Sequence, residues 1–269
     1  MDASLLLIDP QNDFCDLPGA ALPVTGADAD MRRLARFMRD ARPALRDVIV
    51  TLDSHATVSI ERTTFWKQSD GSPVTPFTEV TESAVRDGRY APRDDSLRDE
   101  VLQYLHSLEA GGRYRLMVWP VHCVIGTWGH NIHEAVANEL AEWEVHAQRG
   151  ALKVLKGLNP LTEQYSAVRA EVPRADDPLT HTNAVLITRA RPSEGLLLIA
   201  GEASSHCVAA TVFDLLEATT PEERARVVIL VDCMSPVRGF EANAQQFLAS
   251  VAAQGARVMT TSEVLAELT

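Results

Sequence analysis

Short apolar segments alternate with amphipathic segments along most of the chain, and this alternation constrains the fold strongly. Apolar runs bounded by polar residues are typical of buried strands, and apolar side chains at helical spacing are typical of surface helices. The predicted strands cover residues 5–9, 47–53, 115–120, 151–156, 196–201 and 226–232, and the predicted helices cover residues 27–41, 133–143 and 243–256, with another beginning near 207 and a last strand–helix pair from 257. Strands that alternate with helices form a parallel sheet with helices on both faces. We therefore predict a three-layer α/β/α fold of Rossmann-like type around a central, mostly parallel six-stranded sheet.

The length of 269 residues is enough for one large domain with a full hydrophobic core. Residues 56–113 interrupt the alternation with a proline- and glycine-containing segment and the charged run DGRYAPRDDSLRDE. We predict a single domain over residues 1–269, with an irregular insertion at about 56–113 that contains one short helix or hairpin.

The formal net charge of −12 argues against binding nucleic acid through bulk electrostatics. The chain has no apolar run of about 18 residues, the length a membrane span needs, and its opening residues MDASLLLIDPQNDF do not resemble a signal peptide. The four cysteines are widely spaced, which is typical of free thiols in a reducing compartment. These features predict a cytoplasmic protein that binds neither nucleic acid nor membranes.

Residues with reactive side chains follow several of the predicted strands. Asp9 and Asp53 end the first two strands, Lys156 ends the strand at 151–156, and Cys207 follows the strand at 196–201. In open parallel sheets, ligands bind beyond the carboxyl ends of the strands. We therefore expect these four side chains to converge at one edge of the sheet.

The sequence also contains a candidate metal site. Asp53 and His55 are two positions apart, so in extended chain both side chains face the same way. His122 follows the predicted strand at 115–120 and can complete the set. Although an isolated Asp-x-His pair is common without a metal, two imidazoles and a carboxylate with open positions are typical of catalytic zinc and non-haem iron sites. We predict a divalent metal ion, with zinc as the first choice and iron or manganese as alternatives.

Cys207 lies in the segment GEASSHCV, where a tight turn leads into a helix. A helix N-terminus and the ammonium of Lys156 would both lower the pKa of this thiol and favour the reactive thiolate. Asp9 would accept the thiol proton and later activate water, while backbone N–H groups of the turn hold a developing oxyanion. The alternative is a small buried side chain without chemistry, which is our interpretation of the other three cysteines.

Five motifs in order along nearly the whole chain resemble the isochorismatase-like cysteine hydrolase superfamily, and within it the nicotinamidases. They are LLLIDPQNDF, TLDSH, WPVHCVIGT, LKGLNP and GEASSHCV. The resemblance implies catalytic roles for Asp9, Lys156 and Cys207, and metal ligation by Asp53, His55 and His122.

The resemblance also implies the layout of a substrate pocket. A cis peptide bond is expected between Glu202 and Ala203, with the N–H groups of Ala203 and Cys207 forming an oxyanion hole. Phe14 and Trp119 match positions whose aromatic rings flank the substrate ring in nicotinamidases, although ordinary packing at strand ends would also explain them.

The chain departs from the superfamily pattern around this pocket. Glu61 stands where some members have a second metal histidine, so either Glu61 ligates the metal through oxygen or water takes that position. Ser204 and Ser205 replace the usual Thr-Asp pair before the cysteine. These departures bear chiefly on which substrate fits.

The resemblance implies a metal-dependent cysteine amidohydrolase that releases ammonia from nicotinamide or a related small carboxamide through a thioester. One alternative is a related C–N hydrolase that acts on a carbamoyl group or an acyclic amide, and another is a non-catalytic scaffold. Because relatives often self-associate, a homo-oligomer is expected.

Overall fold

The structure is a computed structural model that describes residues 2–192 and 194–268. Its core is a six-stranded sheet in the order β10-β9-β8-β1-β2-β7. Its strands are β1 Ala3–Ile8, β2 Leu45–Asp53, β7 Leu152–Lys156, β8 Leu196–Gly201, β9 Val227–Leu230 and β10 Arg257–Met259. All five neighbouring pairs are parallel. The predicted α/β/α fold is therefore confirmed.

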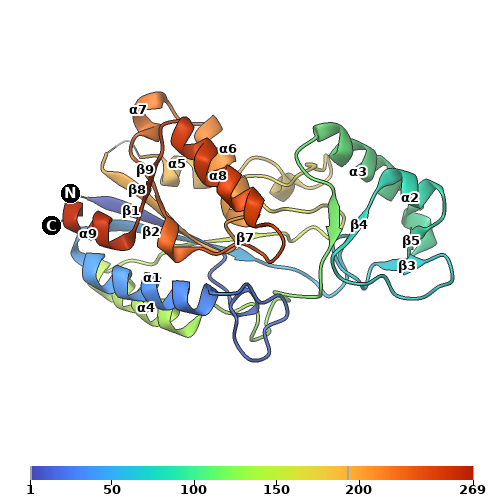
Figure 1. Ribbon diagram of the computed structural model, residues 1–269, viewed down its shortest axis with the longest axis horizontal. Coiled ribbons are helices and arrows are strands. Elements are labelled where there is room, and N and C mark those ends of the chain that lie inside the picture. The colour runs from blue at the N-terminus through green and yellow to red at the C-terminus, as the bar shows by residue number, and fades with distance from the viewer. Residues whose placement is uncertain (1, 193, 269) are drawn as a thin grey trace.

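Helices cover both faces of this sheet (Figure 1). On one face lie α1 Ala27–Ala41, α4 Glu134–Ala147 and α9 Thr261–Leu268; on the other lie α5 Ala184–Ala190, α6 Cys207–Glu217 and α8 Glu241–Ala253, with the short α7 Pro221–Arg224 nearby. Helix α1 shows why the prediction worked, because Met31, Leu34 and Met38 lie at helical spacing and are buried, while Arg32 and Arg36 between them face solvent.

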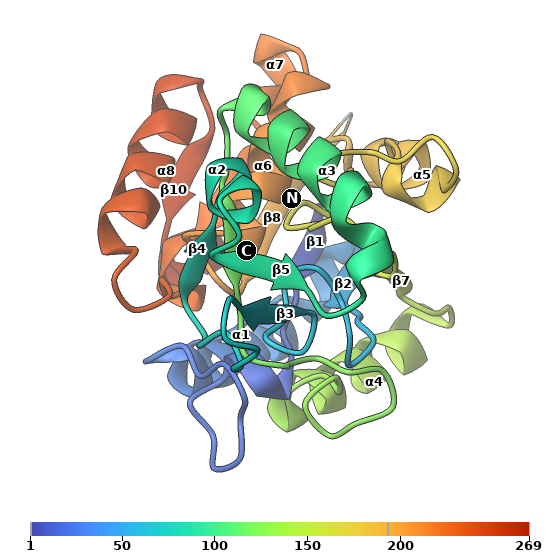
Figure 2. The same cartoon turned by 90° about the vertical axis from the view of Figure 1, so that its right-hand side faces the viewer.

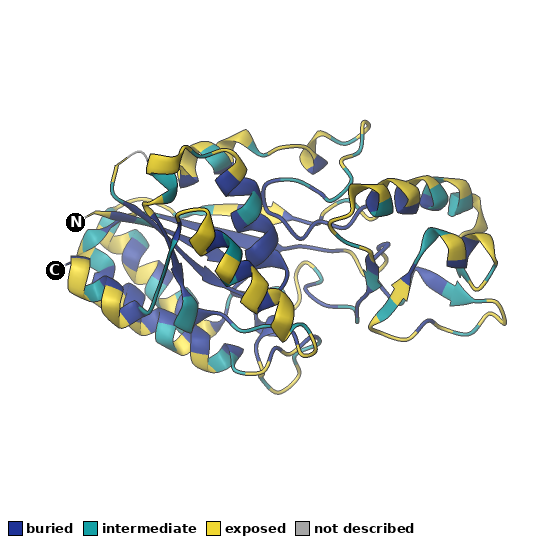
Figure 3. Cartoon of the chain, turned by 45° about the horizontal axis from the view of Figure 1, so that its top comes forward, coloured by how far each residue is buried: buried dark blue, intermediate teal, exposed yellow. Residues whose placement is uncertain are grey.

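Burial is greatest in the middle of the sheet (Figure 3). Every residue of β8 is buried, and β1 is buried except for the half-buried Ser4. Both strands are continuous aliphatic runs without alternating polar residues, which is typical of strands that helices cover on both faces of the sheet. The rigid centre fixes the positions of the residues that follow these strands.

The insertion is more regular than predicted. It contains β3 Trp66–Gln68, β4 Thr78–Val80, α2 Glu82–Arg86, β5 Tyr90–Pro92 and α3 Arg98–Gly111. Strands β3 and β5 form an antiparallel pair, and twelve buried residues including Trp66, Leu105 and Val118 form a hydrophobic core separate from the main one. Our prediction of an irregular segment with one short helix or hairpin was wrong, because the charged run masked the apolar spacing of α3.

The prediction that residues 115–120 form a strand of the central sheet is also wrong. It forms β6 Leu116–Val118, which pairs antiparallel with β4 and lies outside the central sheet. The sixth strand of the central sheet is β10 instead. An apolar run of a few residues predicts a strand but does not identify its partner.

The insertion lies beyond the carboxyl ends of the central strands, at the right of Figure 1, and in Figure 2 its strands and helices stand in front of the sheet. It therefore borders the edge where the reactive residues were expected. Within the described residues, no helix has the length and apolar character needed to cross a bilayer.

Candidate active site

Four reactive side chains lie together at the carboxyl edge of the sheet. Asp9 follows β1 directly, and Asp53 and Lys156 are the last residues of β2 and β7. Cys207 is the first residue of α6, after β8. The four strands are neighbours in the sheet and the four side chains are buried, so the expected convergence is present.

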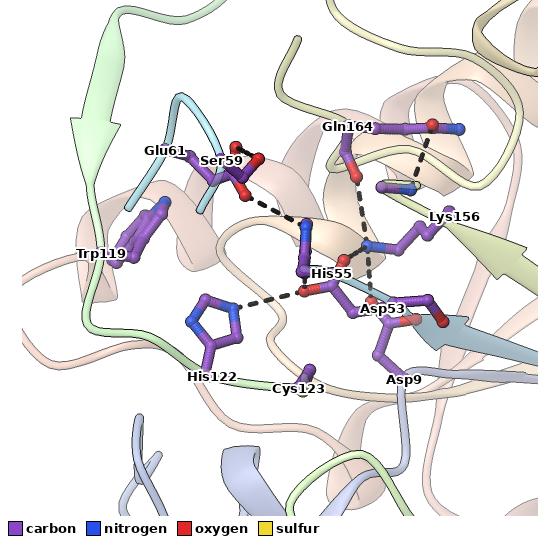
Figure 4. Close-up of polar contacts among 12 residues, drawn as sticks. Asp9, Asp53, His55, Ser59, Glu61, Trp119, His122, Cys123, Lys156 and Gln164 are labelled. Carbon is purple, nitrogen blue, oxygen red and sulfur yellow. Dashed lines mark hydrogen bonds and ion pairs between the residues drawn. The ribbon is translucent and has the colours of Figure 1, made fainter. Parts of the chain in front are cut away.

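Lys156 connects this group, and Figure 4 shows it beside Asp9, Asp53 and Gln164. Its Nζ lies 2.9 Å from Asp9 Oδ2, 2.8 Å from Asp53 Oδ1 and 3.5 Å from Cys207 Sγ, and it donates a hydrogen bond of 3.2 Å to the Gln164 carbonyl. Burial disfavours the ammonium, but the carboxylates of Asp53 and Asp9 outweigh burial and raise the pKa of Lys156 well above its ordinary value. Lys156 is therefore a fixed positive charge beside the sulfur.

Cys207 is a neutral thiol before any reaction begins. We predicted a lowered pKa, but burial raises the pKa of Cys207 well above its ordinary value, because Lys156 only partly offsets burial and the carboxylates of Asp9 and Asp53 add to it. The thiolate must therefore form by proton transfer during a reaction. Asp9 is the adjacent base, and burial raises its pKa despite Lys156, which makes it a better proton acceptor than an ordinary carboxylate.

Asp53, His55 and His122 form the predicted metal-binding set, with one ligand atom from each lying within 4.8 Å of the others. Asp53 Oδ2 is 2.8 Å from His55 Nε2 and 3.3 Å from His122 Nε2 (Figure 4). The donor set of two imidazoles and one carboxylate suits zinc, iron or manganese and leaves coordination positions open. The residues present therefore fit a divalent metal ion.

The two histidines differ in charge. Burial, with the Arg62 guanidinium second, lowers the pKa of His122 to about 4, so its ring is neutral. Burial also disfavours a charge on His55, but Asp53 outweighs burial and raises the pKa of His55 to about 9. Neutral imidazole is the form that binds metals, so a metal ion that binds here must displace the proton of His55.

Glu61 and Arg62 lie behind the two imidazoles. Glu61 Oε1 is 3.1 Å from His55 Nδ1 and forms an ion-pair contact with the ring. Arg62 contacts the ring of His122, whose Nδ1 is 2.8 Å from the Pro120 carbonyl. His122 Nδ1 thus meets both Arg62 and the Pro120 carbonyl, while Nε2 faces Asp53.

The thiol and the metal-binding set border one cavity with about 30 Å³ available to the centres of water molecules. Phe14 and Trp119 line it, as the resemblance implied. Five other lining residues were not predicted from the sequence: Leu22, Glu163, Tyr165, His206 and Val237. The Trp119 indole donates to Tyr165 Oη at 3.1 Å and packs edge-on against His206, with 5.2 Å between ring centroids.

The turn before α6 has the geometry implied by the resemblance, since the peptide bond between Glu202 and Ala203 is cis. Cys207 begins α6, so its N–H belongs to the first helical turn, where backbone donors have no intrahelical partner. Ala203 and Cys207 both border the cavity. His206 directly precedes Cys207, and this adjacency is the one sequence signal that could have identified it.

The fold is similar to that of a solved isochorismatase-like hydrolase from Alkaliphilus metalliredigens, which superposes with a TM-score of 0.56 at 15% identity and covers 100% of both chains. Among individual proteins, the chain is 26% identical to the nicotinamidase of Saccharomyces cerevisiae over 164 residues, which make up 61% of each chain. The solved yeast nicotinamidase bound to the inhibitor nicotinaldehyde superposes with a TM-score of 0.66 at 20% identity, covering 96% of this chain and 99% of that one. The pyrazinamidase of Pyrococcus horikoshii in complex with zinc gives a TM-score of 0.55 at 18% identity, covering 97% and 99%. No family model matches the chain.

Proposed function

We propose that this chain is a cysteine amidohydrolase that releases ammonia from nicotinamide or a closely related small aromatic carboxamide. The observation that carries the proposal is the position of Lys156 Nζ, 3.5 Å from Cys207 Sγ and 2.9 Å from Asp9 Oδ2, beside the same cavity as the metal-binding set. The likeness to nicotinamidases in sequence and fold supports this substrate class.

In the first half of the reaction, Asp9 takes the thiol proton and Cys207 Sγ attacks the amide carbon. The N–H groups of Ala203 and Cys207 hold the oxyanion of the tetrahedral intermediate. Asp9 then gives its proton to the amide nitrogen, the C–N bond breaks and ammonia leaves, so that the acyl group remains on Cys207 as a thioester.

In the second half, Asp9 takes a proton from water and the resulting hydroxide attacks the thioester carbon. The C–S bond breaks, and Asp9 returns the proton to the sulfur as the carboxylic acid leaves. Lys156 keeps its charge throughout, stabilises the thiolate and orients Asp9. General acid–base catalysis of this kind contributes about 10²–10⁴-fold.

The aromatic walls of the cavity would hold the substrate ring, with Phe14 and Trp119 on its two sides. Asp53, His55 and His122 would hold the metal ion, for which zinc is our first choice, supported by the zinc complex of the Pyrococcus pyrazinamidase. A metal ion held by these residues would supply a Lewis acid for the ring nitrogen of the substrate, directly or through a bound water.

An ammonia-release assay over a panel of amides tests the proposal. The panel contains nicotinamide, pyrazinamide, benzamide, an aliphatic amide and a carbamoyl compound. We expect turnover of the first two and its abolition in Cys207→Ala. Turnover confined to the last two would favour the alternative C–N hydrolase, and unchanged ammonia release by Cys207→Ala would reject the nucleophile.

A further inference from the structure

We propose that Glu61 and Arg62 form a buried ion pair that positions the metal-binding imidazole of His55, and that Glu61 is a positioning residue and not a metal ligand. The proposal rests on the metal site of the proposed function. It concerns the position at which related sequences can carry a second metal histidine.

Glu61 and Asp53 contact opposite edges of the His55 ring (Figure 4). Glu61 Oε1 lies 3.1 Å from Nδ1, whereas Asp53 Oδ2 lies 2.8 Å from Nε2. Only Nε2 faces the space shared with His122. The carboxylate of Glu61 is therefore behind the imidazole, on the side away from the other two ligands.

Both oxygens of Glu61 are already engaged. Oε1 accepts a hydrogen bond of 3.0 Å from Arg62 Nε, and Oε2 accepts one of 2.5 Å from Ser59 Oγ. The side chains of Glu61 and Arg62 are 1% and 0% exposed, so water does not compete for these contacts. These two hydrogen bonds fix the carboxylate at the Nδ1 side of the His55 ring, whereas Asp53 lies at Nε2.

Arg62 connects the ion pair to the segment that carries the second imidazole. Its Nη1 donates a hydrogen bond of 3.0 Å to the Pro120 carbonyl, the same oxygen that lies 2.8 Å from His122 Nδ1. The Trp119 N–H donates to the Glu61 carbonyl at 2.7 Å, which pairs the two segments through the backbone. One ion pair thus supports the rear of both imidazoles.

The Cε1 edge of the His55 ring, between its two nitrogens, lies against Gly157. A Cβ added at Gly157, whose φ is +75°, would lie 2.5 Å from His55 Cε1, so only glycine allows the ring to take this position. Gly157 and Glu61 therefore both restrict the position of the ring. Acceptors at the non-ligating nitrogen of a metal histidine orient the ring and increase its basicity, and their removal typically lowers metal affinity by about 10–100-fold.

The test compares Glu61→Gln with wild type in the full-length chain. Glu79→Gln is the matched control, because Glu79 forms an exposed ion pair with Arg115 in the same insertion. Cobalt(II) affinity is measured by competition with a chelator, and the visible absorption spectrum of the cobalt-loaded protein reports the ligand set. We expect Glu61→Gln to bind cobalt about 10–100-fold more weakly with an unchanged spectrum, and Glu79→Gln to match wild type in both.

Unchanged cobalt affinity in Glu61→Gln would overturn the proposal, and so would a spectrum that shows a lost ligand, because Glu61 would then be coordinating. If Glu61→Gln does not fold, the double variant E61Q/R62M, which leaves no buried charge without its partner, replaces it with the same outcomes. A wild type that binds cobalt but releases no ammonia rejects the proposed function and leaves this proposal standing. A wild type that binds no divalent metal overturns it whatever its amidase activity.

Discussion

Glu163 is a single side chain whose protonation state is set by the cavity around it. It is buried, its Oε1 accepts a hydrogen bond of 2.9 Å from the Gln164 N–H, and its Oε2 has no partner among the described residues. Burial, reinforced by the negative charge of Glu61, raises the pKa of Glu163 to about 8 from an ordinary value of 4.5. The carboxyl is therefore a neutral acid at pH 7.

This shift predicts a pH-dependent effect of Glu163→Gln on stability. Between pH 4.5 and about 8, the folded protein keeps a proton that the unfolded chain releases, so the free energy of unfolding of wild type falls as pH rises through this window. Glutamine cannot ionise. Urea denaturation of the metal-free proteins should therefore show a stability difference in favour of Glu163→Gln that grows from pH 5 to pH 8 by about 1 kcal/mol or more. A difference that is constant with pH would contradict the assignment.

Among single residues, the sequence predicts those that lie directly at the end of a strand. Asp9, Asp53 and Lys156 could be found because each ends a recognisable apolar run at the same edge of the sheet. Arg62 and Glu163 could not, because they come from irregular segments whose paths depend on tertiary contacts. The charge state of Cys207 was missed for a different reason, since burial cannot be judged from neighbouring motifs alone.

Helix α3 is the element on which the core of the insertion depends. Val101, Tyr104, Leu105 and Leu108 lie at helical spacing and are all buried against the small antiparallel strands. The Tyr104 hydroxyl also accepts a hydrogen bond of 3.1 Å from the Glu163 N–H, which joins the helix to the wall of the cavity.

Leu105→Ala should therefore destabilise the protein. Leu105 is fully buried, and deletion of a buried leucine side chain typically lowers the free energy of unfolding by about 2–5 kcal/mol. Gln103→Ala, on the exposed face of the same helix, should change it by less than about 0.5 kcal/mol. Chemical denaturation measures both, and equal effects would mean that α3 does not pack as described.

Among the elements, the long periodic ones were predictable and the short ones in the insertion were not. Helix α1 matches the predicted residues 27–41, because about four turns of consistent spacing leave little ambiguity. Strand β6 was assigned to the central sheet because three or four apolar residues do not specify a partner. Contacts distant in sequence decide such cases.

The whole molecule is expected to unfold as one unit, in keeping with the proposed single domain. The insertion is tied to the main core by Arg113, which pairs with Asp214 at 2.8 Å and donates to the Ala210 carbonyl at 2.9 Å on helix α6. The pairing of Trp119 with Glu61 adds a second connection.

Hydrogen exchange followed by mass spectrometry at increasing urea concentration tests this expectation. Peptides from α3 and from β2 should lose protection together near a single midpoint, as in a two-state transition. Exchange of α3 at clearly lower urea would show that the insertion unfolds separately.

The most direct test of the account is the covalent intermediate itself. Wild type and Cys207→Ala are mixed with excess nicotinamide, quenched in acid within one turnover and analysed by intact-protein and peptide mass spectrometry. We predict one acyl group on wild type, located on the peptide that contains Cys207, and none on the variant. Wild type that releases ammonia while its thiol remains unmodified at every time point would contradict the nucleophilic role of Cys207.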